Sequence, residues 1–199
     1  AHDLWRLGDL GRRLLERAGV RGGDRLVTLG LEPDRLAFWQ LSLGARAGGV
    51  SSLHAASVDA QLLVDGAITT VAGSVAAIDA AVADIDGHEI STAIVVGPPP
   101  TQERRTELTE RWGAEVVCAY APAGVRALWS ERRGMPGLVT SADSDVIETV
   151  DDEVVWSSLA WAGTVLLRLR TGVRASHEAV ASGTGGVAIT LLDPELVVS

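Results

Sequence analysis

Apolar residues at the start of the chain recur at intervals of three and four positions, which is the spacing of one face of an α-helix. These positions are Leu4, Leu7, Leu10, Leu14, Leu15 and Ala18. Gly19 follows at the place of a helix C-cap. The pattern therefore predicts an amphipathic helix that ends near Ala18.

Short apolar runs and helical segments alternate from there to about residue 120. The predicted strands are 25–29, 50–54, 69–72, 92–97 and 115–120, and the predicted helices between them are 33–47, 59–65, 75–85 and 103–112. Ser74 is a good N-cap for the third of these helices. Alternation of this kind predicts right-handed βαβ units and a parallel sheet.

The spacing changes beyond Gly134, where short strands follow one another closely. They are predicted at 137–140, 146–150, 154–158 and 165–169, with a further strand-like run at 187–192. The glycine-rich run 182–186 precedes that last segment without a following lysine, so it is predicted to be a turn and not a phosphate cradle. We therefore expect an α/β fold with two parts: residues 1–134 form a doubly wound, mostly parallel sheet, and residues 135–199 form a small antiparallel β-rich subdomain with an irregular C-terminal tail.

Composition narrows the functions that are open to the chain. The 199 residues contain no lysine, so no chemistry that needs a lysine side chain can be carried out by this chain alone. A net charge of −9 disfavours binding to nucleic acid, because phosphate neutralisation needs clustered cations. No apolar stretch reaches the roughly 18 residues of a membrane-spanning helix, and the first residues lack a signal-peptide pattern. We expect a cytoplasmic protein without a membrane partner.

The cysteine and histidine residues give little support for a metal or thiol site. Cys118 is the single cysteine and lies in an apolar run, which predicts a buried hydrophobic residue. The four histidines show no metal-ligand spacing to one another or to Cys118. His54 follows a predicted parallel strand, but a structural role is the expectation for it.

The segment from Ala119 to Gly124 leaves the end of a predicted buried strand and must form a loop there. In an open α/β sheet, ligands bind at the carboxyl ends of the strands. Tyr120 has an aromatic ring that can stack on a planar base. The alternative is a simple turn, formed by Pro122 and Gly124, with a packed tyrosine. The spacing alone leaves both interpretations open.

Four strings follow one another along the chain: LLERAGVRGGDR at 14–25, ARAGGV at 45–50, WGAEVV at 112–117 and LRLRTG at 167–172. In this order and spacing they resemble the adenylate-forming superfamily of acyl-CoA synthetases, and especially its phenylacetate-CoA ligase-like branch. The resemblance covers about residues 4 to 175. It implies ATP and magnesium as cofactors, activation of a small carboxylic acid as an acyl-adenylate, and coenzyme A as the acyl acceptor.

The same resemblance implies a set of nucleotide-binding residues. Tyr120 matches the aromatic residue of the family's Tyr-Gly-x-x-Glu adenine motif, and Arg170 and Thr171 match its Arg-Thr-Gly-Asp ribose motif. The implied nucleotide-binding set is Ala119, Tyr120, Ala121, Pro122, Gly124, Arg170 and Thr171.

Three positions depart from the family's motifs. Ala121 replaces the motif glycine, and Val173 replaces the aspartate that would hold the ribose. Gly124 stands where the family has the glutamate that helps to hold magnesium, a role that an alignment gap would shift to Glu131. The lysine-containing phosphate loop would precede Ala1, and the lid lysine would follow the last residue.

The resemblance therefore implies a partial or degenerate member of the family, a ligase-like pseudoenzyme that is not active alone. The alternative is a non-catalytic binding or assembly module derived from the same fold, with an apolar patch that a second copy or a partner chain covers. A third alternative is a flavodoxin-like enzyme with a coincidental resemblance to the ligases.

Overall fold

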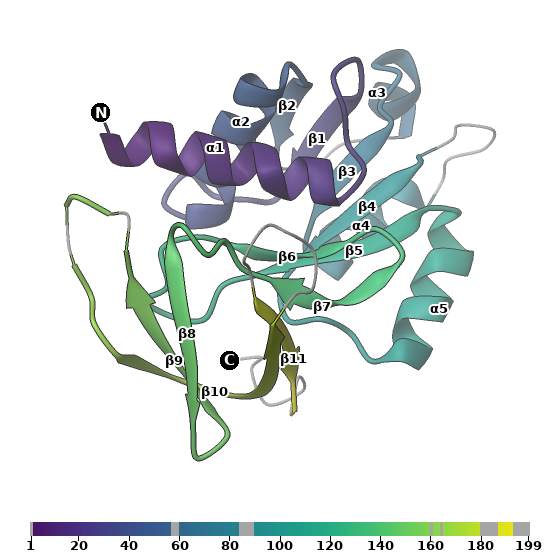
Figure 1. The fold of residues 1–199 in the computed structure, drawn as a ribbon. Helices are drawn as coiled ribbons and strands as arrows, with labels where there is room; N and C mark the ends of the chain where they lie inside the picture. The colour runs from purple at the N-terminus through teal and green to yellow at the C-terminus, as the bar shows by residue number, and fades with distance from the viewer. Residues whose placement is uncertain are drawn as a thin grey trace.

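The computed structural model describes residues 2–56, 60–83, 90–159, 161–163, 165–179 and 187–192. Figure 1 shows one large sheet with helices on both faces of its first half. The helices are α1 (His2–Arg17), α2 (Leu36–Gly48), α3 (Ala60–Asp65), α4 (Val75–Val82) and α5 (Gln102–Trp112). The strands are β1 (Arg25–Leu29), β2 (Ser51–Ala55), β3 (Thr70–Gly73), β4 (Thr92–Val96), β5 (Glu115–Tyr120), β6 (Trp129–Arg132), β7 (Met135–Val139), β8 (Asp145–Val150), β9 (Glu153–Ser158), β10 (Leu169–Ala179) and β11 (Val187–Leu191).

The sheet changes from parallel to antiparallel at its middle. Its strand order is β2-β1-β3-β4-β5-β6-β7-β11-β10-β9-β8. The first five strands pair in parallel, and every pairing from β5–β6 onward is antiparallel. This arrangement confirms the predicted α/β class and its order of parallel and antiparallel parts.

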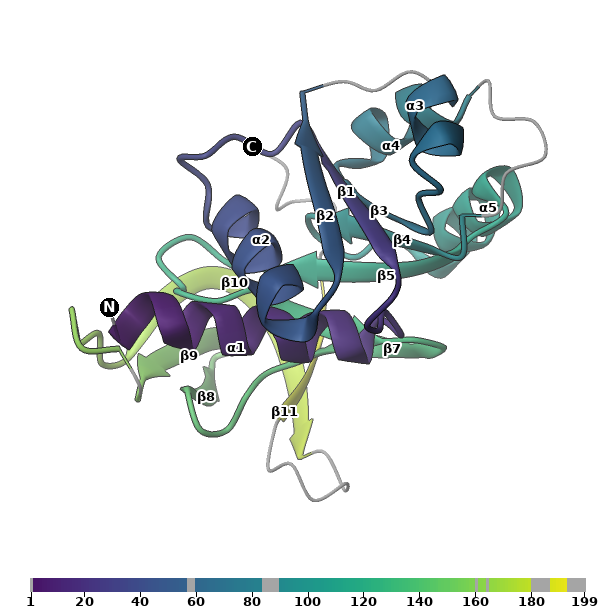
Figure 2. The same cartoon turned by 90° about the horizontal axis from the view of Figure 1, so that it is seen from above.

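Helices cover both faces of the parallel strands, as Figure 2 shows, with α1 and α2 on one face and α3, α4 and α5 on the other. The alternation of side chains along a strand explains how one sheet serves two cores. In β1, Leu26 packs in the core beneath α1 and α2, whereas the next residue, Val27, packs in the core beneath α3, α4 and α5. A third core joins the first half of α1 to the antiparallel strands, around the fully buried Trp129 and Trp156.

Helices α1 and α2 approach each other most closely at two glycines. A Cβ atom added to Gly44 would lie 2.4 Å from the backbone carbon of Gly11, and one added to Gly11 would lie 2.0 Å from the carbonyl oxygen of Gln40. Only residues without a side chain fit at this crossing. The close contact fixes the position of α2, whose first turn borders the cavity described below.

The structure corrects two predictions about strands. The sequence did not predict β6, which inserts between β5 and β7. The predicted strand 165–169 is wrong except for its last residue, because the strand β10 begins at Leu169 and continues to Ala179. The N-cap at Ser74 is confirmed, since its hydroxyl accepts a hydrogen bond from the backbone N–H of Ala77 (3.2 Å).

The division of the chain at residues 134 and 135 stays a prediction. Strands β6 and β7 pair across this point, with Arg132 opposite Met135, so the sheet runs through it without interruption. The glycine-rich run 182–186 lies outside the described residues. None of the helices that the structure describes is long and apolar enough to span a bilayer.

Candidate functional site at the carboxyl edge of the sheet

A cavity of about 470 Å³ lies where β1, β4 and β5 end. Three segments of the chain form its walls: the β1–α2 loop with the first turn of α2, the end of β4, and the chain between the end of β5 and the start of β6. Its lining residues are Leu31, Asp34, Arg35, Leu36, Ala37, Val96, Gly97, Ala119, Tyr120, Ala121, Pro122, Gly124, Val125 and Leu128. Carboxyl ends of parallel strands are the usual ligand edge of an open α/β sheet. We call this the Tyr120 cavity.

The structure brings five of the seven predicted nucleotide-binding residues together on this cavity. They are Ala119, Tyr120, Ala121, Pro122 and Gly124. Tyr120 is the last residue of β5 and is only 8% exposed, because it packs in the third core. Burial raises the pKa of the Tyr120 phenol, so the ring is uncharged at neutral pH. It presents a neutral aromatic surface to the cavity.

Two glycines shape the floor and rim of the Tyr120 cavity. The N–H of Gly97, directly after β4, donates to the carbonyl oxygen of Ala119 (2.9 Å), and a Cβ atom at Gly97 would meet no atom within 4 Å. Gly124 has a φ of 83°, in the left-handed region that favours glycine. A Cβ atom at Gly124 would also lie 2.8 Å from Cδ2 of Leu169. The local backbone therefore suits the glycine and not the glutamate of the family motif.

The first turn of α2 contributes backbone N–H groups to the same wall. Arg35 is the N-cap residue, and its side chain makes no capping hydrogen bond. The next two residues, Leu36 and Ala37, line the cavity. The unpaired N–H groups of a helix N-terminus attract anions, since they are donors at the positive end of the helix dipole. The helix thus offers a place for a phosphate or carboxylate group beside the apolar walls.

Arg170 and Thr171 do not line the Tyr120 cavity. The Arg170 guanidinium Nε donates to Glu153 (2.6 Å), and the Thr171 hydroxyl donates to the carbonyl oxygen of Val154 (2.9 Å). The start of β10 nevertheless reaches the cavity rim, because Leu169 lies against Gly124. Val173 is buried in the third core, at 5% exposure. The structure thus brings the predicted ribose motif near the site without placing its side chains in it.

Glu131 also lies away from the cavity and is engaged elsewhere. It is 2% exposed on β6. One of its carboxylate oxygens accepts from Arg105 (2.6 Å) and the other accepts from the backbone N–H of Cys118 (2.8 Å). Cys118 is fully buried, as predicted, and burial raises the pKa of its thiol. This cluster stabilises the junction of β5, β6 and α5.

The lining residues do not fit a resident magnesium ion. Magnesium binds hard oxygen ligands, usually carboxylates, and Asp34 is the single carboxylate on the cavity lining. Among the residues that the structure describes, no cluster of three metal-ligating side chains occurs. No chemical step through a metal ion follows from this arrangement.

Sequence reasoning missed the residues that the β1–α2 loop supplies. Leu31, Asp34 and Arg35 follow a strand of the parallel set, so the same rule that pointed to Tyr120 applies to them. Asp34 and Arg35 lie at the exposed mouth and pair with each other (3.6 Å). The signal was present in the order of elements, but Asp34 was interpreted only as the start of a helix.

No known protein family and no curated protein matches this sequence. Solved structures do match its fold. A 2-hydroxyisobutyryl-CoA ligase in complex with 2-HIB-AMP and CoA superposes with a TM-score of 0.81 at 14% identity, over 95% of this chain and 48% of the ligase. An arginine-to-lysine variant of E. coli MenE with bound OSB-AMS gives a TM-score of 0.62 at 13% identity, over 94% of this chain and 44% of MenE.

The N-terminal domain of FACL13 from Mycobacterium tuberculosis is also similar, with a TM-score of 0.56 at 19% identity, over 86% of this chain and 51% of that domain. The structural neighbours are adenylate-forming acyl-CoA ligases. At these identities the similarity shows a shared fold and not a shared activity. The chain spans about half the length of each of these neighbours.

Proposed function

We propose that the Tyr120 cavity binds an adenylate, either AMP itself or the AMP part of an acyl-adenylate. One observation carries the proposal: an aromatic ring, an uncapped helix N-terminus and apolar walls meet in a single cavity at the carboxyl edge of the parallel sheet. Each feature matches one part of an acyl-adenylate.

The three parts of the ligand find different partners. The ring of Tyr120 stacks on the adenine, an interaction worth about 1 to 3 kcal/mol for a base on an aromatic side chain. The N–H groups at the start of α2 hold the phosphate. The apolar lining, with Leu31, Leu36 and Val125 among its members, accepts the acyl chain.

We propose further that the chain is a partial, degenerate member of the phenylacetate-CoA ligase-like branch that does not catalyse ligation by itself. Catalysis of adenylation depends on cations and metal ions that stabilise phosphate charge. The chain has no lysine, and Arg35 is the one cation on the lining of the Tyr120 cavity. A small carboxylic acid and coenzyme A remain proposed partners, because a structural neighbour is described with 2-HIB-AMP and CoA.

Isothermal titration with AMP and with a stable acyl-adenylate analogue tests the binding proposal. We expect the Tyr120→Ala protein to bind the analogue roughly tenfold or more weakly than the wild type, because it loses the stacking surface. Tyr120→Phe keeps the ring and is the matched control, so its affinity should stay within about threefold of the wild type. Absence of binding by the wild type at millimolar ligand, or equal affinities for the two variants, would contradict the proposal.

An ATP–pyrophosphate exchange assay tests the statement about catalysis. We expect no exchange of pyrophosphate into ATP above background with any carboxylic acid tested. Measurable exchange by the purified chain would show that it forms acyl-adenylates and would overturn the assignment as a pseudoenzyme.

The alternative function is that of an assembly module, and one observation favours it. Leu4 and Trp5, near the start of α1, are 58% and 68% exposed. Large apolar side chains that gather on a surface often mark a contact with a partner. In this function a second copy or a partner chain covers α1. Light scattering tests it, since a Trp5→Ser change should shift an oligomer toward the monomer, whereas a wild-type monomer at all concentrations would exclude self-association.

A further inference from the structure

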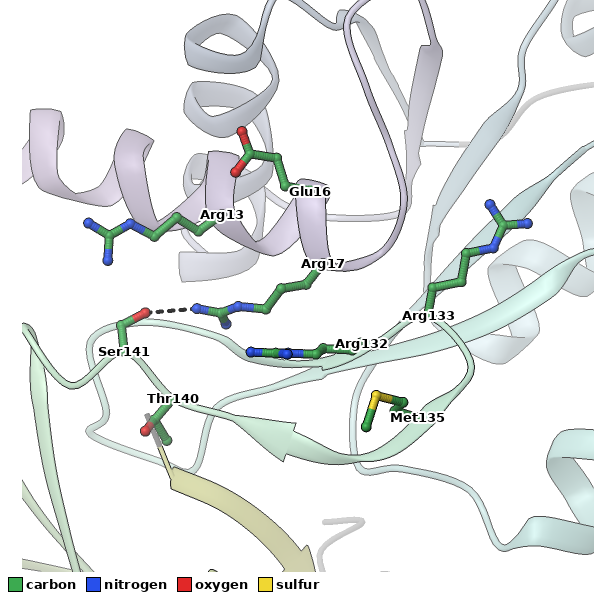
Figure 3. A pocket seen from close by; sticks show the side chains of 8 residues that line it. All are labelled: Arg13, Glu16, Arg17, Arg132, Arg133, Met135, Thr140 and Ser141. Atoms are coloured by element: carbon green, nitrogen blue, oxygen red, sulfur yellow. Dashed lines mark hydrogen bonds between the residues drawn. The ribbon is translucent and has the colours of Figure 1, made fainter. Parts of the chain in front are cut away.

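Four arginines are among the eight residues that line a second cavity, of about 530 Å³ (Figure 3). The end of α1, the β6–β7 turn and the residues after β7 form it. Its lining residues are Arg13, Glu16, Arg17, Arg132, Arg133, Met135, Thr140 and Ser141. We call it the arginine cavity. Four of the chain's 17 arginines gather here, although the whole chain carries a net charge of −9.

The arginine cavity and the Tyr120 cavity lie at opposite edges of the parallel sheet. The backbone N–H of Arg133 donates to the carbonyl oxygen of Arg17 (2.9 Å), and its side chain reaches the carbonyl oxygen of Ser91 (3.5 Å), just before the start of β4. The Tyr120 cavity instead includes Gly97, which follows the end of β4. The two cavities therefore belong to different sites.

Arg13 is the one cavity arginine with a carboxylate at ion-pairing distance among the described residues, whereas Arg17, Arg132 and Arg133 have none. Arg13 is neutralised by Asp143, to which both of its terminal nitrogens donate (3.0 Å each). Arg17 donates only to uncharged acceptors: the carbonyl oxygen of Val139 (3.0 Å) and the hydroxyl oxygens of Ser141 (3.0 Å) and Ser130 (3.4 Å). Neither Arg17 nor Arg132 forms an ion pair with another residue in the described part of the chain.

The charges of Arg17 and Arg132 repel each other across the cavity wall. Burial, with repulsion from Arg132 and Arg13 that outweighs the attraction of Asp143 and Asp145, lowers the pKa of Arg17 to about 10. Arg17 therefore remains protonated at neutral pH. Figure 3 shows the two guanidinium groups extending in the same direction toward Ser141, whereas that of Arg133 points away. Two neighbouring cations that form no ion pair are stabilised when an anion binds between them.

The remaining groups suit an oxyanion. The Ser141 hydroxyl accepts from Arg17, and the Thr140 hydroxyl accepts from the N–H of Val187 (3.2 Å), so each keeps its own O–H to donate. The one carboxylate on the lining, Glu16, is paired with Arg12. Guanidinium groups bind phosphate oxygens through paired hydrogen bonds. The volume exceeds that of a bare phosphate and lies within the usual range of small-molecule sites.

We propose that the arginine cavity is a binding site for a phosphate group, carried by a small organic phosphate, with Arg17 and Arg132 as its charged ligands. This site is separate from the proposed adenylate site and does not depend on it. Phosphate enters between the two guanidinium groups, and the hydroxyls of Thr140 and Ser141 donate to its oxygens. The exposed side chain of Met135 lies beside the organic part.

Titration calorimetry with inorganic phosphate and with glycerol 3-phosphate, in a buffer free of phosphate, tests the site. We expect saturable binding by the wild type and at least tenfold weaker binding by Arg132→Gln. Arg46→Gln is the matched control: it removes one arginine charge from the exposed end of α2, and its affinity should stay within twofold of the wild type. Arg132→Lys should bind with intermediate affinity, since it keeps the charge and loses the paired hydrogen bonds.

Equilibrium unfolding gives an independent measurement, which compares each variant with and without ligand. Phosphate should stabilise the wild type and Arg46→Gln more than sodium chloride does at the same ionic strength, and should not do so for Arg132→Gln. Tyr120→Ala should keep the phosphate response, which separates this site from the adenylate site. The proposal would be overturned if phosphate stabilised Arg132→Gln and Arg46→Gln equally, or if it stabilised the wild type no more than chloride does. Absence of phosphate binding by the wild type would also overturn it.

Discussion

Glu131 of β6 and Arg105 of α5 form a buried ion pair, and this pair gives Glu131 a structural role. Both carboxylate oxygens of Glu131 have partners in the protein, the Arg105 guanidinium and the Cys118 N–H. A charge buried in this way is stable only while its partner remains. Glu131 thus has a structural role in the β5–β6 junction, away from the Tyr120 cavity.

Replacing Arg105 tests that role. We predict that Arg105→Met lowers the free energy of unfolding by about 3 kcal/mol, because the Glu131 carboxylate is then left buried and unpaired. Arg104→Met is the matched control, since Arg104 is the neighbouring arginine and pairs with Glu107 on the exposed face of α5. It should have little effect. Urea unfolding followed by circular dichroism measures both, and equal losses would contradict the account.

For single residues, the sequence predicts some positions in the fold and fails to predict others. The position of its strand allowed Tyr120 to lie at the ligand edge, and Tyr120 does line a cavity there, while its role in nucleotide binding stays a prediction. Arg170 and Thr171 were assigned by motif; they contact Glu153 and Val154 and do not line the cavity, and their role in nucleotide binding also stays a prediction. The difference arises because a strand's end follows from the order of elements, whereas the direction of a side chain depends on neighbours distant in sequence.

At the scale of elements, the packing of α1 on α2 positions the first turn of α2 at the cavity. We predict that Gly44→Ala destabilises the protein by about 2 kcal/mol or more, because the new methyl group meets the backbone of Gly11 and one of the helices must move. Gly8→Ala is the control: its Cβ atom would lie 3.5 Å from Leu43, an ordinary contact, and alanine favours the helix. Thermal unfolding compares the two, and a neutral Gly44→Ala would refute the close crossing.

Four strands of the parallel half, β1, β3, β4 and β5, were predictable because each is buried almost throughout and consists mainly of apolar residues. The strand β6 was not, since Trp129, Ser130, Glu131 and Arg132 contain polar and charged residues. Its two central residues are nevertheless buried, because Glu131 finds Arg105 and the Ser130 hydroxyl lies near Arg17. A pattern of hydrophobic positions cannot reveal a strand whose burial depends on ion pairs.

The predicted start of β10 was too early, because apolar residues precede the strand. These are residues 165–167, and they include the exposed Val165 and Leu167.

At the scale of the whole molecule, the sheet separates two cavities of opposite character. The Tyr120 cavity has apolar walls, an aromatic ring and a helix N-terminus, and the arginine cavity has guanidinium groups and hydroxyls. The overall composition, with its negative net charge, gave no sign of a cationic site, because the arginines that form it come from α1 and from the β6–β7 turn. Only the fold brings them together.

A crystal structure of the protein soaked with AMP tests the central claim most directly, because AMP carries both an adenine and a phosphate and the electron density shows which cavity holds each. The account predicts electron density in the Tyr120 cavity, with the adenine against the Tyr120 ring and the phosphate at the start of α2. Adenine density in the arginine cavity alone, or an empty Tyr120 cavity at saturating AMP, would contradict it.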